Sequence, residues 1–86
     1  MSFDEVWTKA ALADIGEVPV AGRDQIEALV REICRDPRAV GRPDLSGAGA
    51  SHAEDRVAVA GPAVVFYRVI DAEDKIVYIA RVRWRT

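Results

Sequence analysis

The sequence is poor in the residues that build disulfides, metal centres and membrane spans. It holds one cysteine, Cys34, and one histidine, His52, so neither a disulfide within the chain nor a Cys/His cluster with metal-ligand spacing is available. No apolar run approaches the roughly 18–20 residues that cross a bilayer, and the N-terminus lacks a basic segment followed by an apolar stretch. We therefore predict a cytoplasmic protein without a metal, a cofactor or a membrane partner.

Acidic residues are missing from the C-terminal end. The 86 residues, which predict a single domain over 1–86, carry a net charge of −2, and this alone does not suggest a nucleic-acid partner. Residues 75–86 nevertheless contain four basic side chains and no acidic one: Lys75, Arg81, Arg83 and Arg85. Because local charge decides what a surface attracts, this end is a candidate binding surface for anions.

Two helices are predicted in the first half of the chain. Thr8 can cap a short helix over residues 9–15. A second helix is predicted from Pro19 to Asp36, because apolar residues recur there at helical spacing. They form one stripe, which consists of Ile26, Leu29, Val30, Ile33 and Cys34. Cys34 is therefore expected to be a small buried hydrophobic residue rather than a nucleophile.

Three β-type runs follow a Gly-, Ala- and Ser-rich loop over residues 41–54. They cover residues 56–60, 63–71 and 75–85, and the short turns between them favour an antiparallel meander. A weak alternating pattern over residues 3–8 allows an additional opening strand. The predicted fold class is α+β, with two helices packed on one face of a small antiparallel sheet.

Alternation along the last strand predicts two faces. The side toward the helices is expected to carry Ile76, Tyr78, Ala80, Val82 and Trp84. The other side is expected to carry Val77, Ile79, Arg81, Arg83 and Arg85. Three arginines on one face are either a solvated surface that discourages aggregation or a ladder for phosphate groups, and the sequence leaves both interpretations open.

A few other side chains are candidates on chemical grounds. His52 and Glu54 are candidate general bases, although a histidine in such a loop is more commonly just exposed to solvent. Trp84 lies between two arginines, but its place in the alternation favours the core over base stacking. Tyr67 is expected in the core, and the face on which Arg68 lies stays open.

Three phrases of the sequence, taken in order, resemble the RelE/ParE superfamily of bacterial toxins. VWTKAALADI resembles the family's opening strand and first helix, and IEALVREICRDPRAVGRPDLSG is similar to its second helix and the loop after it. DRVAVAGPAVVFYRVIDAEDKIVYIARVRWR is similar to its meander. The resemblance implies a RelE-like fold over nearly the whole chain. It also implies either cleavage of mRNA on the ribosome or poisoning of DNA gyrase, with neutralisation by an antitoxin.

The resemblance places only part of the family's catalytic set in this chain. Arg56 matches a basic position on the first meander strand, and Arg85 matches the arginine that ends the last strand. The arginine that usually follows the glycine turn falls on Ala63 or Val64. The family's C-terminal tyrosine has no counterpart up to Thr86.

We therefore expect a RelE-like protein that binds RNA, including ribosome-bound mRNA, with weak or absent endoribonuclease activity. Its RNA-binding residues would be Arg56, Arg81, Arg83 and Arg85, and Arg56 and Arg85 would be the catalytic candidates. An active endoribonuclease toxin that uses the same arginines is the first alternative. The second is a ParE-like or protein-binding module that acts only on gyrase or an antitoxin.

Overall fold

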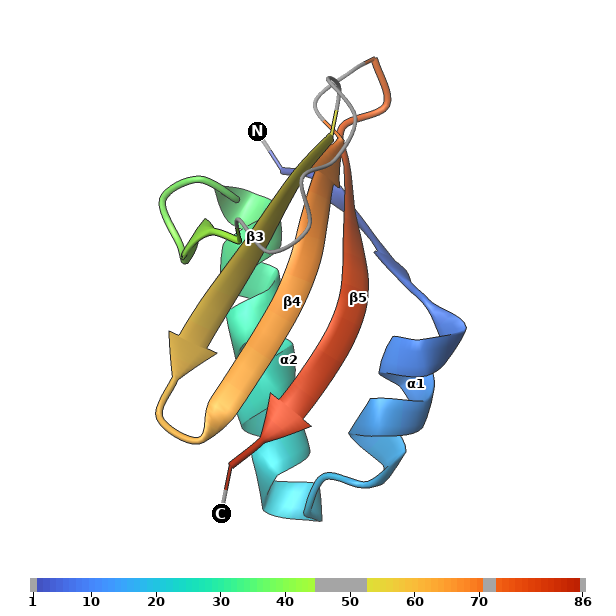
Figure 1. Cartoon of the computed structure of the whole chain (residues 1–86), viewed down its shortest axis with the longest axis vertical. Helices are drawn as coiled ribbons and strands as arrows, with labels where there is room; N and C mark the ends of the chain where they lie inside the picture. The colour runs from blue at the N-terminus through green and yellow to red at the C-terminus, as the bar shows by residue number, and fades with distance from the viewer. Residues whose placement is uncertain (1, 45–52, 71–72, 86) are drawn as a thin grey trace.

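Two helices and a five-stranded sheet make up the structure, a computed structural model that describes residues 2–44, 53–70 and 73–85 (Figure 1). The elements in chain order are β1 (Asp4–Trp7), α1 (Lys9–Gly16), α2 (Val20–Arg35), β2 (Arg42–Pro43), β3 (Ala53–Ala60), β4 (Ala63–Ile70) and β5 (Ile76–Trp84). The strand order is β1-β5-β4-β3-β2. β1 and β5 run parallel, and the other neighbours are antiparallel. The predicted α+β class is confirmed.

The predicted meander corresponds to β3, β4 and β5, which pair in sequence order. β3 begins at Ala53, earlier than the predicted start at residue 56. The weak opening pattern forms β1 and extends the sheet beside β5. β2 adds a short strand inside the segment that was expected to be only a loop. His52, Asp71 at the predicted end of the second β run, and Thr86 lie outside the described residues.

The two helices form where the sequence predicts them. Thr8 caps α1, because its hydroxyl oxygen accepts a hydrogen bond from the backbone N–H of Ala11 at 3.1 Å. The same hydroxyl donates to the carbonyl oxygen of Ala80 at 2.9 Å, which ties the start of α1 to β5. α2 begins directly after Pro19 and lies across one face of the sheet (Figure 1).

The core lies between α2 and the sheet. The whole predicted helix stripe is buried: Ile26, Leu29, Val30, Ile33 and Cys34. The sheet contributes Ala58, Ala63, Val65, Tyr67, Val69, Val77, Ile79 and Val82. Tyr67 is 1% exposed, so its predicted place in the core is confirmed.

Trp84 packs at the edge of this core, against the first turn of α2. A Cβ atom on Gly22 would lie only 2.9 to 3.0 Å from three atoms of the indole ring. Gly22 is a poor helix former, and it stands where the ring comes closest to the helix backbone. The prediction that Trp84 packs with the core is confirmed, and its place is at the core's edge.

One extra residue in β5 changes which side chains face α2. Phe66 pairs with Arg81, but the next residue of β4, Tyr67, pairs with Ile79. Ala80 is therefore left without a partner across the ladder, which is the geometry of a β-bulge. Inward-facing positions are odd-numbered before the bulge and even-numbered after it.

The predicted faces of the last strand are consequently wrong over residues 76–80. Val77 and Ile79, expected on the open face, are 0% exposed and belong to the core. Tyr78, expected toward the helices, lines the opposite face of the sheet instead. Regular alternation fails because the bulge shifts the register by one residue. Beyond the bulge, residues 81–84 have the predicted orientation.

Candidate functional site

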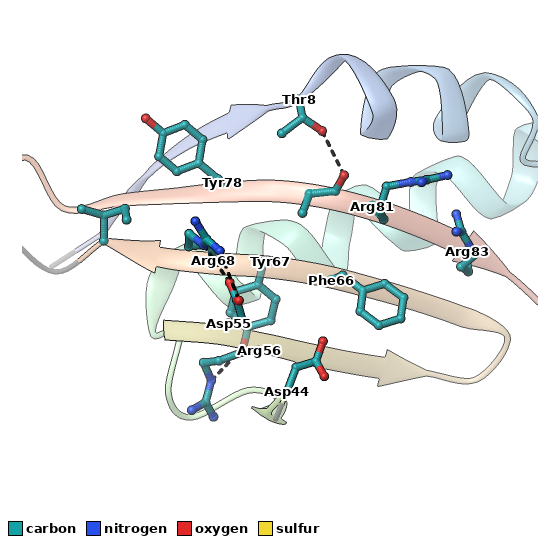
Figure 2. Close-up of a pocket in the computed structure, with 12 residues that line it drawn as sticks. Thr8, Asp44, Asp55, Arg56, Phe66, Tyr67, Arg68, Tyr78, Arg81 and Arg83 are labelled. Carbon is teal, nitrogen blue, oxygen red and sulfur yellow. Dashed lines mark hydrogen bonds and ion pairs between the residues drawn. The ribbon is translucent and has the colours of Figure 1, made fainter. Parts of the chain in front are cut away.

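The sheet face opposite α2 is hollowed into a pocket of about 670 Å³ (Figure 2). Its aromatic and charged lining includes Asp55 from β3, Phe66 and Arg68 from β4, and Tyr78, Arg81 and Arg83 from β5. The bulge brings Tyr78 to the same face as Arg81 and Arg83. This face therefore combines aromatic rings with cationic groups.

A carboxylate from α1 holds the two arginines of β5. Arg81 donates from Nε to Oδ2 of Asp14 at 2.8 Å and from Nη2 to Oδ1 at 3.0 Å. Arg83 donates from Nη1 to Oδ2 at 3.3 Å, and the backbone N–H of Val82 donates to the same oxygen at 2.9 Å. These contacts, led by the hydrogen bond from Arg81, lower the pKa of Asp14 from 3.8 to about 2. Asp14 is therefore a firmly ionised group.

A second arginine–carboxylate pair joins β3 and β4 across the pocket. Arg68 donates from Nε to Oδ1 of Asp55 at 2.7 Å and from Nη2 to Oδ2 at 3.2 Å. The two residues are opposite each other in the strand register, and the hydrogen bond raises the pKa of Arg68. Arg68 thus lies on the open face, which the sequence left undecided.

Phe66 and Tyr78 supply the aromatic part of the face (Figure 2). Phe66 lies opposite Arg81 in the register of β4 and β5, and Tyr78 lies opposite Arg68. Opposed residues on one face of an antiparallel pair are direct neighbours, so each aromatic residue has an arginine as its cross-strand neighbour. Aromatic rings next to cations are what single-stranded nucleic acids need for base stacking and phosphate contact.

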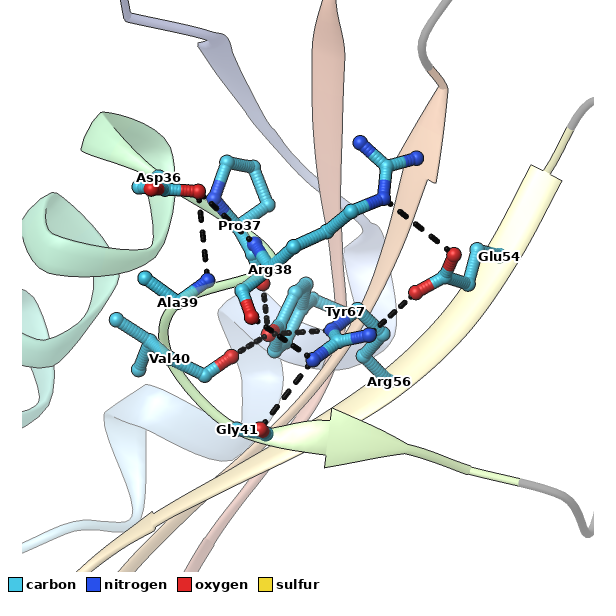
Figure 3. Close-up of polar contacts among 9 residues, drawn as sticks. All are labelled: Asp36, Pro37, Arg38, Ala39, Val40, Gly41, Glu54, Arg56 and Tyr67. Atoms are coloured by element: carbon cyan, nitrogen blue, oxygen red, sulfur yellow. Dashed lines mark hydrogen bonds and ion pairs between the residues drawn. The ribbon is translucent and has the colours of Figure 1, made fainter.

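Arg56 also lines the pocket, but its guanidinium is buried on the core side of the sheet and does not join Arg81 and Arg83. The residue is 7% exposed and lies opposite Tyr67 in the register. It donates to the Tyr67 hydroxyl at 3.2 Å and to the carbonyl oxygen of Gly41 at 3.2 Å (Figure 3). Figure 2 shows its side chain pointing away from Arg81 and Arg83. These contacts fasten the segment after α2 to β3.

Glu54, one of the candidate bases, belongs to the same network of polar contacts, and its side chain is 36% exposed (Figure 3). Its carboxylate forms ion pairs with Arg56 and, at 3.5 Å, with Arg38. The hydrogen bond from Arg56 lowers the pKa of Glu54, which makes it a weaker proton acceptor. The Tyr67 hydroxyl lies 2.7 Å from the carbonyl oxygen of Pro37 and can donate to it.

Arg85, in contrast, is not among the residues that line the pocket. Its guanidinium donates to the carbonyl oxygen of Gly61 at 2.8 Å, and its backbone N–H donates to that of Pro62 at 2.8 Å. Both contacts tie the end of the described chain to the turn between β3 and β4. Of the four predicted RNA-binding residues, Arg56, Arg81 and Arg83 line the pocket, but only Arg81 and Arg83 share a partner, Asp14.

The remaining candidates concern metals, membranes and the thiol. Within residues 2–44, 53–70 and 73–85, no three His, Cys, Asp or Glu side chains are grouped so that they could hold a metal ion. No helix in the same ranges is long and apolar enough to cross a membrane. Cys34 is buried, and desolvation raises the pKa of its thiol to about 11, so it is unsuited to act as a nucleophile.

Sequence reasoning missed Asp14, Phe66 and Tyr78. Asp14 lies 67 positions before Arg81, and no local pattern connects the two. Tyr78 was hidden because residues 76–80 are apolar at both odd and even positions, so the bulge leaves no trace in the pattern. Phe66 and Arg68 are two positions apart in a strand and therefore share a face. Knowing the face of one residue would have given the face of the other.

Comparisons with known proteins give clear matches in structure alone. No family model matches the sequence, and no curated protein matches it significantly. The RelBE2 toxin–antitoxin complex from Mycobacterium tuberculosis contains a chain that is 25% identical, with a TM-score of 0.84 over 99% of this chain and 100% of that one.

Two further complexes contain similar chains. The similar chain of the archaeal RelE–RelB complex from Pyrococcus horikoshii OT3 is 17% identical to this one. Its TM-score is 0.77, over 99% of this chain and 97% of the archaeal chain. That of the intact RelBE complex from E. coli is 20% identical, with a TM-score of 0.70 over 99% of both chains. The topology, the helices and these likenesses together establish that the chain has a RelE-like fold.

Proposed function

We propose that this chain is a RelE-like toxin that acts in the cytoplasm as a single domain and binds RNA on the open face of its sheet. Weak or absent endoribonuclease activity is part of the proposal. The similar chains come from toxin–antitoxin complexes, which supports both the toxin role and an antitoxin protein as a second partner.

The observation that carries the RNA proposal is the placement of Arg81 and Arg83 beside Phe66 and Tyr78 on one hollowed face. Guanidinium groups bind phosphate oxygens with paired hydrogen bonds, and aromatic rings stack on bases without regard to sequence. The Arg81 and Arg83 side chains are 47% and 50% exposed, so solvent and ligands can reach them.

Weak cleavage follows from what surrounds that face. RNA cleavage by 2′-hydroxyl attack needs a proton acceptor, cations around the phosphorane-like transition state and a proton donor. Asp14 and Asp55 are both held by arginines, and a carboxyl with a pKa of about 2, such as Asp14, is a poor base at neutral pH. Ala63 and Val64, where the family arginine would stand, carry no charge and are buried. One missing transition-state donor costs about 3 kcal/mol, or roughly a hundredfold in rate.

The test is binding of a fluorescently labelled single-stranded RNA, followed by anisotropy over a range of salt concentrations. Affinity should fall with salt by about 0.7 log unit per decade for each phosphate contact. Changing both Arg81 and Arg83 to Ser should weaken binding and flatten that slope. Changing Arg31 and Arg35 to Ser removes the same charge from the exposed surface of α2 and should leave the slope unchanged.

Equal losses of RNA affinity in the two double variants would show that the protein attracts RNA by its overall charge and not at a specific face. Unchanged binding after loss of Arg81 and Arg83 would make this face a merely solvated surface. The same RNA, run on a gel after incubation with and without ribosomes, should stay intact. Efficient cleavage by the wild type that is lost when Arg81 and Arg83 are replaced would instead support the alternative of an active endoribonuclease toxin.

A further inference from the structure

We propose that Asp14 is a resident competitor for the anion site of Arg81 and Arg83, and that a phosphate group binds there by replacing its carboxylate. This inference rests on the proposed function, because it names the residue that sets the affinity of the same face for RNA. Asp14 would thereby be an affinity-determining residue located on a helix outside the sheet.

The donors around Asp14 are arranged as an anion site. Four N–H groups converge on its two oxygens: Arg81 Nε, Arg81 Nη2, Arg83 Nη1 and the backbone N–H of Val82, at 2.8 to 3.3 Å. A phosphodiester also presents two non-bridging oxygens to a guanidinium fork, so it can use the same donors. Because the Val82 N–H belongs to β5, part of the site is fixed by the backbone.

The charge and exposure of the site favour exchange. Two guanidinium groups share one carboxylate, which leaves one excess positive charge in this group. The Asp14 side chain is only 14% exposed, whereas the two arginines are about half exposed and accessible from the pocket side. An incoming phosphate can therefore contact the guanidinium groups before Asp14 leaves them.

α1 is held by contacts other than that of Asp14, including one from Arg23 to the carbonyl oxygen of Gly16 at 3.0 Å. Ala11 is the one residue of this helix that is fully buried, and Leu12 is 56% exposed. The Thr8 hydroxyl holds the start of α1 to β5 independently of Asp14. A rotation of the Asp14 side chain about its own torsions can therefore release the carboxylate while the helix stays in place.

Competition predicts a measurable gain when Asp14 loses its charge. Half-exposed arginine–carboxylate contacts are worth little each, so we expect the Asp14→Asn variant to bind phosphate and RNA about fivefold more tightly. The asparagine oxygen can still accept from the Val82 N–H, which limits the damage to the fold. Asp24→Asn removes the same charge from the exposed surface of α2 and is the matched control.

The first experiment uses inorganic phosphate and NMR of the wild-type protein, with sodium chloride added as the ionic-strength reference. The backbone amide of Val82 reports directly on the site, since it donates a hydrogen bond to the Asp14 carboxylate. We expect its resonance and that of Arg81 Nε to shift and saturate with phosphate, and to do so at lower concentration in Asp14→Asn. Phosphate that leaves Val82 of the wild type unmoved overturns the inference, as does equal phosphate affinity in Asp14→Asn and Asp24→Asn.

The second experiment repeats the RNA titration with the same variants. Tighter binding by Asp14→Asn alone supports the inference on the proposed ligand. If wild type, Asp14→Asn and Asp24→Asn bind RNA equally, the proposed function survives and the competitor role is wrong. If phosphate shifts Val82 but none of the proteins binds RNA, the anion site and its competitor stand, and the RNA function fails.

Discussion

Gly22 offers a sharp test of how α2 is seated on the sheet, because it touches the ring of Trp84. A methyl group at this position would lie 2.9 Å from Cη2 of Trp84 and 3.0 Å from Cζ2 and Cζ3. An indole ring cannot bend out of the way, so either the ring or the first turn of α2 has to move. We therefore expect Gly22→Ala to destabilise the protein.

Two opposing effects set the magnitude. Replacing a helical glycine by alanine normally stabilises by about 0.5–1 kcal/mol. Overpacking at a close contact costs about 1–3 kcal/mol. The expected balance is a loss of about 1–2 kcal/mol in the free energy of unfolding, measured by urea denaturation and far-UV circular dichroism.

Gly16→Ala is the control, because nothing lies within 4 Å of its would-be Cβ atom and the residue also belongs to a helix. This variant should be neutral or slightly more stable than wild type. In a Trp84→Phe background the smaller ring should relieve the clash, so Gly22→Ala should cost less there by more than about 0.5 kcal/mol. A Gly22→Ala protein as stable as the Gly16→Ala protein would refute the packing described for Trp84.

Two further predictions concern Asp14 and Tyr67. The pKa of Asp14 is about 2 in the folded chain and near 3.8 when unpaired, so the unfolded chain takes up the proton first as pH falls. About 1–2 kcal/mol of stability, after discounting for the half-exposed arginines, should therefore be present above pH 5 and lost toward pH 2. Urea midpoints at several pH values should show a flatter decline for Asp14→Asn, and parallel curves would contradict the pairing. Tyr67→Phe leaves buried Arg56 without one acceptor and should cost about 1–3 kcal/mol in the same assay, whereas an unchanged midpoint would show that the network adds no stability.

The parts of the fold that depend on local pattern were predictable. The stripe from Ile26 to Cys34 has a single period, and burying it needs an apolar sheet face of similar length. The turn at Gly61 and Pro62 fixes the pairing of β3 with β4. Helix ends and the order of the three meander strands follow from such local signals, because each acts over a few residues, whereas the parallel pairing of β1 with β5 does not.

The site was only partly predictable, since its contacts join residues far apart in the chain. Arg81 and Arg83 were identified from their spacing, but their partner Asp14 comes from α1. Arg56 looked equivalent to them by charge alone. Its position opposite Tyr67, which turns it into a buried structural residue, depends on the register of β3 and β4.

The bulge at Ala80 explains how one strand can serve both the core and the open face. In a regular strand, Val77, Ile79, Arg81 and Arg83 would share a side, because all are odd-numbered. Either the two arginines would then be pressed against α2, where unpaired charges are costly, or the two apolar residues would be lost from the core. One inserted residue removes this conflict: Val77 and Ile79 pack inward before it and Val82 after it, while Tyr78, Arg81 and Arg83 gather outside. The residues on the open face of the sheet are thus a consequence of which residues of β5 the core needs.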